Sequence, residues 1–505
     1  MKWLNRSVFA IFIFLVYSSF RPSEPATSLY VSSFENVLGT SFDLKVRAVS
    51  ENRSDLAETV ALNEIDRLSS ILSSYDPKSE FSRWQATHGE PVKISKELYE
   101  VFELFDTWRV ATHGALDPAA GKIIQVWKTA EARQQMPSES ELAAVVNEVQ
   151  QKHWELDPGR QTAVHINSTP LVLNSFVKSY IINKVAEKIM HIDGITAAVV
   201  NIGGDIVIAG DHQEIVRVID PLANGENDMP LSTLSLRGKA IATSGNYRRG
   251  FSVNGEWFSH IVDPRTGKPA GHVLSAAVVA DNATDAGALA TAFNILTPEE
   301  ANQLALEKNA EYQIITADGR RIESEGWRKL DMPSTPPIAK SVVANDGQLM
   351  WNKDYEVAVN LELMRFEERS RRPFVAIWVE DSKKNTVRTV ALWFNKPRWL
   401  PDLKEWFHKN SGKYQNGTKD VFSISSATRP PGTYTIKWDG KDDDGEYVPP
   451  GNYTVYIEVA REHGTYQIMK QDITCKGKLQ KFDIPGNAEV SAASVEYRKV
   501  TTSNQ

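Results

Sequence analysis

Hydrophobic and polar residues alternate in two different patterns along the chain, and the change falls near residue 345. Before it, apolar residues recur at helical spacing in the segments 55–73, 95–112, 138–150 and 283–296. Short strands are predicted within 29–48 and 196–207, and a capping box at 297–300 opens a further helix. Helices and strands without strict alternation predict an α+β fold for residues 28–330.

The last third of the chain is rich in β-branched and aromatic residues. They form short runs at 356–364, 374–379, 387–394, 434–438 and 452–459, with turn clusters between the runs. This pattern predicts an all-β, immunoglobulin-like sandwich over residues 346–500, joined to the first domain by a proline-rich linker at 331–345. The tryptophans of this domain are expected in its core rather than on a sugar-binding surface.

Residues 1–27 predict a signal peptide followed by a short linker. Lys2 and Arg6 precede a mostly apolar stretch at 7–20, which is short for a membrane span. An N-terminal anchor helix is the alternative. No later stretch approaches a spanning length, so the mature protein is expected to be exported, periplasmic or associated with the cell envelope, without a membrane span after signal removal.

Composition narrows the function classes further. The 505 residues include 57 Lys and Arg against 64 Asp and Glu, and the formal net charge of −7 provides no basic face for nucleic acid. The single cysteine, Cys475, excludes an intrachain disulfide framework and a cysteine-based zinc site. A chain of this length is expected to form about two or three domains.

Three polar clusters are candidates for chemistry. The first holds Thr243, Ser244, Gly245 and Tyr247, where small residues let backbone N–H groups approach a phosphate. The second holds His260, Asp263 and Arg265 in a segment bent by proline and glycine, and it is either a site or a turn in which Asp263 bonds to its own backbone. The third holds Gly203, Gly204 and Asp205 after an apolar strand, where paired glycines permit a ligand or a bulge.

The predicted helix at 283–292 contains many small residues, so it can pack tightly or line a ligand site. Thr291 and Asp285 are candidate ligands for Mg²⁺. Asp285 equally suits a helix N-terminus, where the dipole favours a carboxylate. The position that shares the helix face of Thr291, one turn before it, is Gly287.

These segments resemble the FAD:protein FMN transferase family, once described as thiamine-biosynthesis lipoproteins. Eight segments match in the family's order, at 38–40, 74–80, 114–118, 178–180, 201–205, 242–247, 260–269 and 288–292. The resemblance implies an α+β flavin-transferase fold. It also implies Mg²⁺-dependent transfer of FMN from FAD to a Thr or Ser hydroxyl of an exported acceptor protein, with release of AMP.

The resemblance assigns roles by position. FAD, as the substrate, would be bound by Tyr75, Asp117, Lys178, Gly203, Gly204, Asp205, Thr243, Ser244, Gly245 and Tyr247. The catalytic loop would be organised by His260, Asp263 and Arg265. The Mg²⁺ ion would be held by Thr291 and a nearby carboxylate, for which Asp285 is the candidate.

Several positions depart from the family's pattern. The metal-binding Asp of the family falls on Gly287, and Asn183 stands where the family has a second Asp. The stretch before Lys178 has lost its acid and its glycines, and Ser179 replaces the glycine that follows the lysine. Losing two carboxylates removes about two negative charges from a cation site. The chain is therefore interpreted as a divergent transferase that uses Asp285, or as a catalytically silent flavin-binding or interaction protein.

The C-terminal part resembles a β-rich exported domain of uncharacterised type that accompanies flavin-transfer systems. The matching segments are 376–381, 398–403, 438–440, 448–453 and 460–464. Within this domain, residues 425–428 are similar to the motif that FMN transferases modify, which makes Thr428 a candidate FMN acceptor. The alternative is an ordinary Ser/Thr-rich loop before Pro430.

Overall fold

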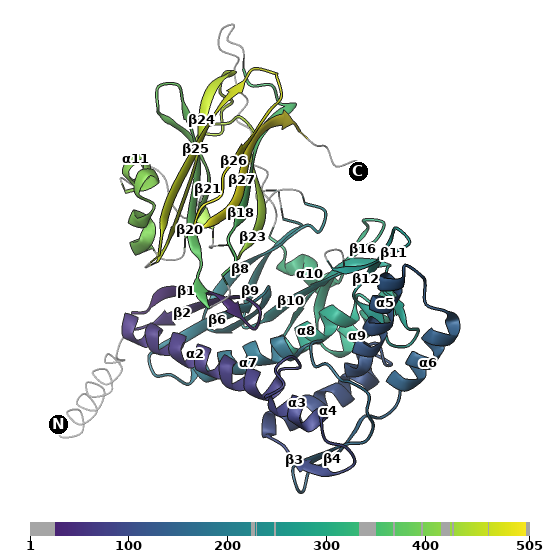
Figure 1. The fold of residues 1–505 in the computed structure, drawn as a ribbon. Coiled ribbons are helices and arrows are strands. Elements are labelled where there is room, and N and C mark those ends of the chain that lie inside the picture. Colours follow the sequence, from purple (N-terminus) through teal and green to yellow (C-terminus); the bar gives the residue numbers. More distant parts are fainter. Residues whose placement is uncertain are drawn as a thin grey trace, which may run out of the picture.

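The computed structural model describes residues 26–223, 228, 230–246, 249–332, 350–366, 369–394, 397–415, 425–426, 429–462 and 464–500. Most of the predicted signal segment and linker, together with Tyr247 and Thr428, lie outside the described residues. An α+β unit is followed by a β-rich unit, in agreement with the change of pattern near residue 345 (Figure 1). Among the helices of the described ranges, none combines the length and hydropathy that a bilayer span requires.

The α+β unit is built on a nine-stranded antiparallel sheet. Its strands are, in order, β17 (Arg321–Glu323), β16 (Glu311–Thr316), β15 (Val273–Ala280), β10 (Ala240–Gly245), β7 (Asp205–Gly210), β6 (Ile195–Ile202), β2 (Thr40–Ala48), β1 (Ser28–Val37) and β19 (Ser370–Arg371). Smaller sheets are formed by β3 (Pro91–Lys93), β5 (Thr162–His165) and β4 (Trp154–Asp157), by β8 (Gln213–Val218) and β9 (Ser232–Arg237), by β11 (Gly250–Val253) and β12 (Glu256–Ser259), and by β13 (Val262–Asp263) and β14 (Lys268–Pro269).

Helices cover one face of this sheet. They are α2 (Glu51–Leu72), α3 (Glu80–Gln85), α4 (Lys96–Ala111), α5 (Gly121–Arg133), α6 (Glu139–Val149), α7 (Val177–Met190), α8 (Ala283–Ala292) and α9 (Pro298–Glu307), with a 3-10 helix at Pro118–Ala120. The opposite face carries the β8–β9 hairpin and α10 (Glu325–Leu330). Because side chains alternate along a strand, Val200 of β6 packs under the helices while Val199 packs under the hairpin.

The predicted helices are present with small shifts at their ends. The segments at 55–73, 95–112 and 138–150 correspond to α2, α4 and α6. The capping box is confirmed, since the Thr297 hydroxyl accepts from the Glu300 N–H and the Glu300 carboxylate accepts from the Thr297 N–H. Helix α7 was not predicted. It follows Phe176, whose side chain makes no capping hydrogen bond, so no local start signal precedes it.

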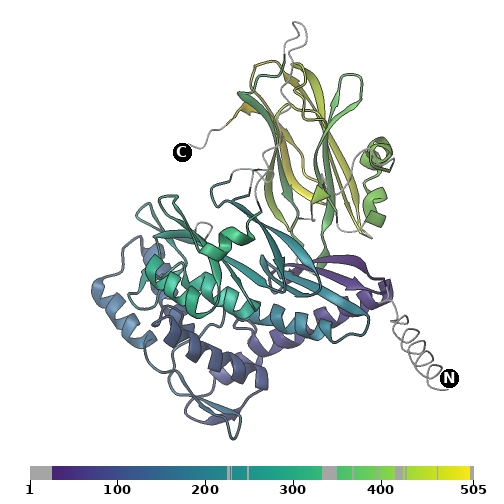
Figure 2. The same cartoon turned by 180° about the vertical axis from the view of Figure 1, so that it is seen from behind.

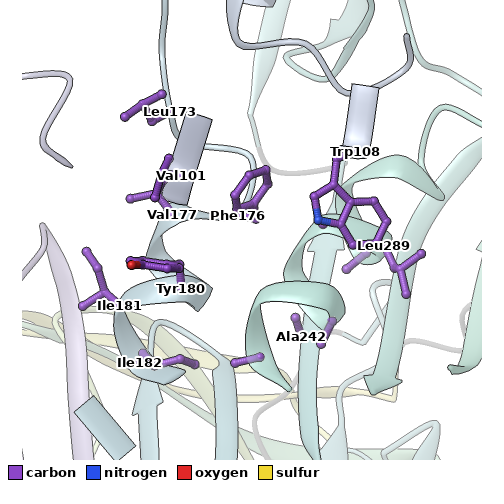
Figure 3. Packing of buried hydrophobic residues seen from close by; sticks show 14 of the residues in the cluster. Val101, Trp108, Leu173, Phe176, Val177, Tyr180, Ile181, Ile182, Ala242 and Leu289 are labelled. Atoms are coloured by element: carbon purple, nitrogen blue, oxygen red, sulfur yellow. The ribbon is translucent and has the colours of Figure 1, made fainter. Parts of the chain in front are cut away.

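Helices α7 and α8 position the candidate site. Figure 3 shows Phe176 and Tyr180 from the α7 segment and Leu289 from α8 in the apolar cluster above the sheet. Phe176 lies 4.4 Å from the ring of Phe105 in α4, measured between ring centroids. The many small side chains of α8 are buried, so this helix can lie close to its neighbours. The tight-packing interpretation of the segment at 283–292 agrees with this arrangement.

The β-rich unit consists of two sheets that enclose a common core. One contains β23 (Gly432–Trp438), β18 (Tyr355–Leu363), β27 (Val490–Lys499) and β26 (Gln480–Ile484). The other contains β22 (Ser425–Ser426), β21 (Thr386–Trp393), β20 (Pro373–Asp381), β24 (Gly451–Arg461) and β25 (Tyr466–Cys475). Trp438 and Trp393 lie in the shared core, as expected of its tryptophans. The β-rich prediction is confirmed, and the immunoglobulin-like arrangement of the strands stays a prediction.

Helix α11 (Lys404–Gln415) was not predicted, although the strand beneath it shows where it packs. In β20, Val375 and Ile377 point into the sandwich, whereas Phe374 and Trp378 point outward into a second cluster. That cluster also contains Trp406 of α11, and a 3-10 helix at Pro397–Asp402 precedes the helix. Both faces of β20 are therefore covered, which explains its continuous apolar run.

The two units are joined by strand pairing and by buried charges. Strand β19 extends the edge of the nine-stranded sheet by pairing with β1. The Arg372 guanidinium donates to the carboxylates of Glu35 and of Asp43, the latter at 2.8 Å. Figures 1 and 2 show the β-rich unit beside the β1–β2 hairpin. The predicted second domain thus supplies the edge strand of the first, and the predicted domain limits stay predictions.

Candidate functional site

The start of α7 faces the turn between β6 and β7. The Ser179 hydroxyl donates to Asp205 Oδ2 at 2.9 Å, and Lys178 Nζ lies 3.9 Å from the same oxygen. A Cβ atom on Gly203 would lie 2.8 Å from Thr40 Oγ1 and 3.3 Å from Lys178 Nζ. Gly203 also has a positive φ of 61°, so a side chain is excluded there on two grounds. Glycine therefore lets the lysine reach this turn.

Burial raises the pKa of the Asp205 carboxyl, and the nearby Lys178 ammonium and the Ser179 hydroxyl lower it in part. The second glycine of the turn, Gly204, has no neighbour within 4 Å of an added Cβ. Its N–H donates to Asn201 Oδ1 at 3.0 Å. The structure thus brings together Gly203, Gly204 and Asp205 of one sequence cluster and Lys178, which the resemblance assigns to the FAD site.

Helix α8 contacts α7 and the residue pair before it at two positions one turn apart. The Thr291 hydroxyl donates to the carbonyl oxygen of Ser175 at 3.0 Å. A Cβ atom on Gly287 would lie 2.7 Å from Ser179 Cβ and closer still to Ser179 Oγ. The Ser179 side chain therefore occupies the space in front of Gly287. Ser175 and Ser179 were not among the residues singled out for the site.

Asp285 lies at the N-terminus of α8, where it takes part in the helix cap. The Asn282 side chain accepts from the Asp285 N–H at 2.9 Å and donates to Asp285 Oδ2 at 2.8 Å. Asn183 accepts from the Ala283 N–H at 3.3 Å. The Asp285 carboxylate thus has the helix-start environment that the sequence also suggested. Within the described ranges, no group of three or more His, Cys, Asp or Glu is placed to hold a metal ion.

His260 follows β12, and both its backbone N–H and its ring bond to the carbonyl oxygen of Arg249. Its Nδ1 atom lies 3.0 Å from the carbonyl oxygen of Arg249. A carbonyl only accepts, so Nδ1 carries the proton and Nε2 of a neutral ring keeps its lone pair. In the part of the chain that the structure describes, Nε2 has no hydrogen-bond partner. Burial lowers the pKa of His260 below its usual value, so the neutral ring is favoured.

Asp263 and Arg265 form a fork that fixes the loop after His260. Arg265 Nε and Nη2 donate to the two carboxylate oxygens of Asp263 at 2.9 and 3.0 Å, and the Arg265 N–H donates to the same carboxylate at 2.9 Å. Arg265 Nη1 also lies 3.4 Å from Glu300 Oε1. Trp127 Nε1 donates to the Gly267 carbonyl at 2.9 Å. Asp263 bonds to its own backbone, as one interpretation of the turn proposed, and also pairs with Arg265.

Two buried asparagines tie the end of β10 to its neighbours. Asn294, just after α8, donates to the carbonyl oxygens of Ser244 at 3.2 Å and Ala290 at 2.8 Å. Asn246 donates to the Ala270 carbonyl at 3.3 Å, in the segment that follows the His260 loop. These contacts link the segment at 243–245 with both α8 and the loop. Sequence reasoning missed Asn294, because its partner in β10 is distant in the chain.

Tyr75 and Asp117 occupy contrasting environments. The Tyr75 side chain is at the surface, with 79% of the residue exposed, and its phenol accepts from the Asn174 amide. Asp117 is buried, caps the 3-10 helix by accepting from the Ala119 N–H at 2.8 Å, and pairs with Arg109 at 2.9 Å. Burial raises the pKa of the Asp117 carboxyl despite Arg109. Both Asp117 oxygens therefore have structural partners.

The sheet, the α7 and α8 helices and the loop after His260 define a protein of the flavin-transferase fold. The ApbE protein of Thermotoga maritima is 26% identical, with a TM-score of 0.54 and a match that covers 60% of this chain and 100% of that chain. The flavin transferase ApbE from Vibrio cholerae is similar in fold, with a TM-score of 0.50 at 21% identity over 60% of this chain and 99% of that chain. The model of the ApbE family matches residues 38–316, more than half of the chain, and the chain belongs to this family.

Curated relatives agree with this membership. The FAD:protein FMN transferase of Klebsiella pneumoniae (strain 342) is 26% identical over 311 residues, which cover 60% of this chain and 88% of that protein. The FAD:protein FMN transferase of Haemophilus influenzae is 28% identical over 321 residues, which cover 59% of this chain and 91% of that protein. Residues 356–492 match a second family, described as a predicted periplasmic protein (DUF2271).

Proposed function

We propose that this chain transfers FMN from FAD to a Ser or Thr hydroxyl of an exported acceptor protein and releases AMP. The observation that carries the proposal is the neutral His260 ring, whose Nε2 lone pair is unpartnered within the described residues. The ring stands on a loop held by the Asp263–Arg265 fork. A general base needs this combination of a free acceptor atom and a fixed position.

The proposed reaction is a displacement at phosphorus. The acceptor hydroxyl oxygen forms a bond to the phosphorus of the FMN half of FAD, and the bond from that phosphorus to the oxygen of AMP breaks. His260 Nε2 takes the hydroxyl proton, and AMP leaves with the electron pair of the broken bond. Lys178, beside Gly203 and Gly204, supplies positive charge for the pyrophosphate. Tyr75, Asp117, Thr243, Ser244, Gly245 and Tyr247 stay proposed FAD-site residues.

Mg²⁺ is implied by the resemblance, and the described side chains fit it poorly. Where α8 meets the segment before α7, the oxygen atoms are the Thr291 hydroxyl and the Ser175 carbonyl, which are both neutral. Mg²⁺ in proteins is usually held by one or two carboxylates together with substrate phosphates. Asp285, the proposed second ligand, is hydrogen-bonded within the α8 cap. No step of the proposed reaction is therefore assigned to a metal ion.

The proposed acceptor is an exported protein that carries a Ser/Thr flavinylation motif. A periplasmic or cell-envelope location is supported by the description of the family that matches residues 356–492. Thr428 of this chain is itself a proposed acceptor and lies outside the described residues. The proposed signal peptide at 1–27 likewise falls almost entirely outside them.

A second candidate function is a catalytically silent flavin-binding or interaction protein. This second function is favoured by the position of Ser179, whose side chain fills the space in front of Gly287. An acidic side chain therefore does not fit at position 287 of α8. Binding of FAD without AMP release would support this function over the first.

The test measures AMP release by chromatography from the purified full chain, incubated with FAD and with or without an acceptor protein. Replacing His260 by Gln is expected to reduce acceptor-dependent release by about 10²–10⁴-fold, the usual contribution of a general base. The matched control is His191→Gln, because the His191 Nδ1 atom also bonds to a backbone carbonyl, that of Glu187, at the surface away from this loop. Equal rates for the two variants would contradict the role of His260, and FAD binding without AMP release would favour the second function.

A further inference from the structure

We infer that this chain binds the pyrophosphate of FAD without a divalent cation, because Ser179 and Gly287 together close the position from which a carboxylate would hold the ion. The inference rests on the proposed function, since FAD is the ligand. It concerns the packing of two helices, α7 and α8, and the chemistry of the oxygen atoms between them.

The first step is steric. Gly287 precedes Thr291 by one turn of α8, so the two positions share a helix face. A Cβ atom at 287 would lie 2.7 Å from Ser179 Cβ, below the 3.0 Å under which real Cβ atoms essentially never approach another atom. Ser179 is buried, and its hydroxyl is bonded to Asp205, so it does not turn away freely. No side chain, and hence no carboxylate, fits at 287 while Ser179 is present.

The second step concerns the donors that remain. The Thr291 hydroxyl donates a hydrogen bond to the Ser175 carbonyl, so these two neutral oxygens are already partnered with each other. Asp205 accepts from Ser179 and lies 3.9 Å from Lys178 Nζ, so its charge is partly balanced within the protein. At the start of α8, the neutral amide Asn183 bonds to the Ala283 N–H. A dication would gain little from this set, because hard cations prefer charged oxygen ligands.

The third step concerns the ligand. A pyrophosphate needs hydrogen-bond donors and positive charge, and protein groups can supply both without a dication. Lys178 Nζ lies 3.3 Å from the position of an added Cβ on Gly203, at the glycine turn between β6 and β7. Among the described residues, the N-cap residue Phe176 gives α7 no side-chain cap, so N–H groups of its first turn are further donors. The phosphates can therefore be held by protein groups.

The experiment measures FAD affinity by flavin fluorescence in excess EDTA and in excess Mg²⁺. For the wild-type chain the two affinities are expected to agree within about twofold, because the nearby Asp205 carboxylate is already paired with Ser179 and Lys178. The double variant Ser179→Gly/Gly287→Asp opens the position and adds a carboxylate, so its FAD affinity should rise about tenfold or more with Mg²⁺. The matched control is Ser179→Gly/Gly287→Asn, which has the same shape without the charge and should not respond to Mg²⁺.

A second measurement follows thermal unfolding of the apo variants by circular dichroism. Gly287→Asp alone should unfold at a lower temperature than the double variant with Ser179→Gly, since only the double variant relieves the clash. Equal unfolding temperatures would overturn the pairing of Ser179 with Gly287. FAD binding by the wild-type chain only with Mg²⁺ would overturn the inference and leave the proposed function standing. FAD binding in neither buffer would overturn both.

Discussion

Replacing Arg372 by methionine is expected to weaken the contact between the two domains strongly. Its side chain is 2% exposed, and it bridges Glu35 of β1 and Asp43 of β2 from the β-rich unit. Methionine has a similar length and no charge, so it leaves two largely buried carboxylates without their cation. The pair with Asp43, at 2.8 Å, contributes about 6 kcal/mol of attraction at an effective dielectric constant of about 20, before the opposing desolvation.

The net loss is smaller because the wild-type charges are themselves desolvated. Removing one partner of a buried ion pair costs about 3–5 kcal/mol. With a urea dependence of about 2 kcal/mol per molar, the unfolding midpoint should fall by about 2 M. The assay is urea unfolding of the full chain, followed by tryptophan fluorescence and circular dichroism, because two domains need not unfold together.

The pH dependence of this loss has a defined sign. Burial raises the pKa of Glu35 above 4.5 even though Arg372 lowers it, so the pKa should rise further in the variant. The folded variant then binds a proton that the unfolded chain lacks, in the window between 4.5 and the raised pKa. The difference in stability from wild type should therefore shrink as the pH falls through that window.

The matched control is Arg369→Met, which removes a more exposed pair between the same units. Arg369 lies 2.6 Å from Asp66, and their side chains are 34% and 58% exposed. Such surface pairs contribute about 0–1 kcal/mol, so the control should lose little. Equal losses in the two variants would refute the argument that burial of Arg372 determines the strength of the contact.

Three further outcomes are expected. Burial lowers the pKa of His260, so the transfer rate should fall with acidification only below pH 6.5. The free energy of unfolding should also fall there, because the unfolded chain takes up the proton at a higher pH than the folded chain does. A pH profile of AMP release that is the same in the His260→Gln variant would contradict this. The Asp263→Ala variant leaves the half-buried Arg265 guanidinium without its carboxylate partner. The free energy of unfolding, measured by urea titration, should fall by about 1.5–3 kcal/mol. An unchanged free energy would show that the Asp263–Arg265 pair is dispensable for stability. Burial raises the pKa of Cys475 to about 12, so this thiol should react with a disulfide reagent only when the chain unfolds, and rapid labelling of the native protein would be inconsistent with its burial.

Local signals predicted the parts of the fold that depend on neighbours in sequence. The start of α9 follows from Thr297 and Glu300, which are three residues apart and bond to each other. Helix α7 escaped prediction because Phe176 supplies no capping hydrogen bond. The β20 strand was predicted from its apolar run. Helix α11 was not predicted, although it covers the outer face of β20 and so explains why that face is apolar.

The candidate site divides in the same way. The motif positions Lys178, Gly203, Gly204 and Asp205 were found from the sequence, and the structure places them together. The environment of Asp285 could be resolved only by its contacts with Asn282, because a carboxylate in the first turn of a helix suits either a cap or a metal. The sequence showed two separate departures from the family's pattern: Ser179 in place of a glycine, and Gly287 in place of an aspartate. It did not show that these two residues contact each other.

Residue order alone therefore establishes the family and the α+β and β-rich parts, because periodicity, caps and motifs involve residues close along the chain. It also predicts the segments that carry the chemistry. The bond between Thr291 and Ser175, 116 residues apart, and the ion pair between Arg372 and Glu35, 337 residues apart, follow from packing. Such contacts depend on how helices and sheet edges fit together in space. That fit places Ser179 in front of Gly287 and thereby determines which charges lie at the proposed site for the flavin phosphates.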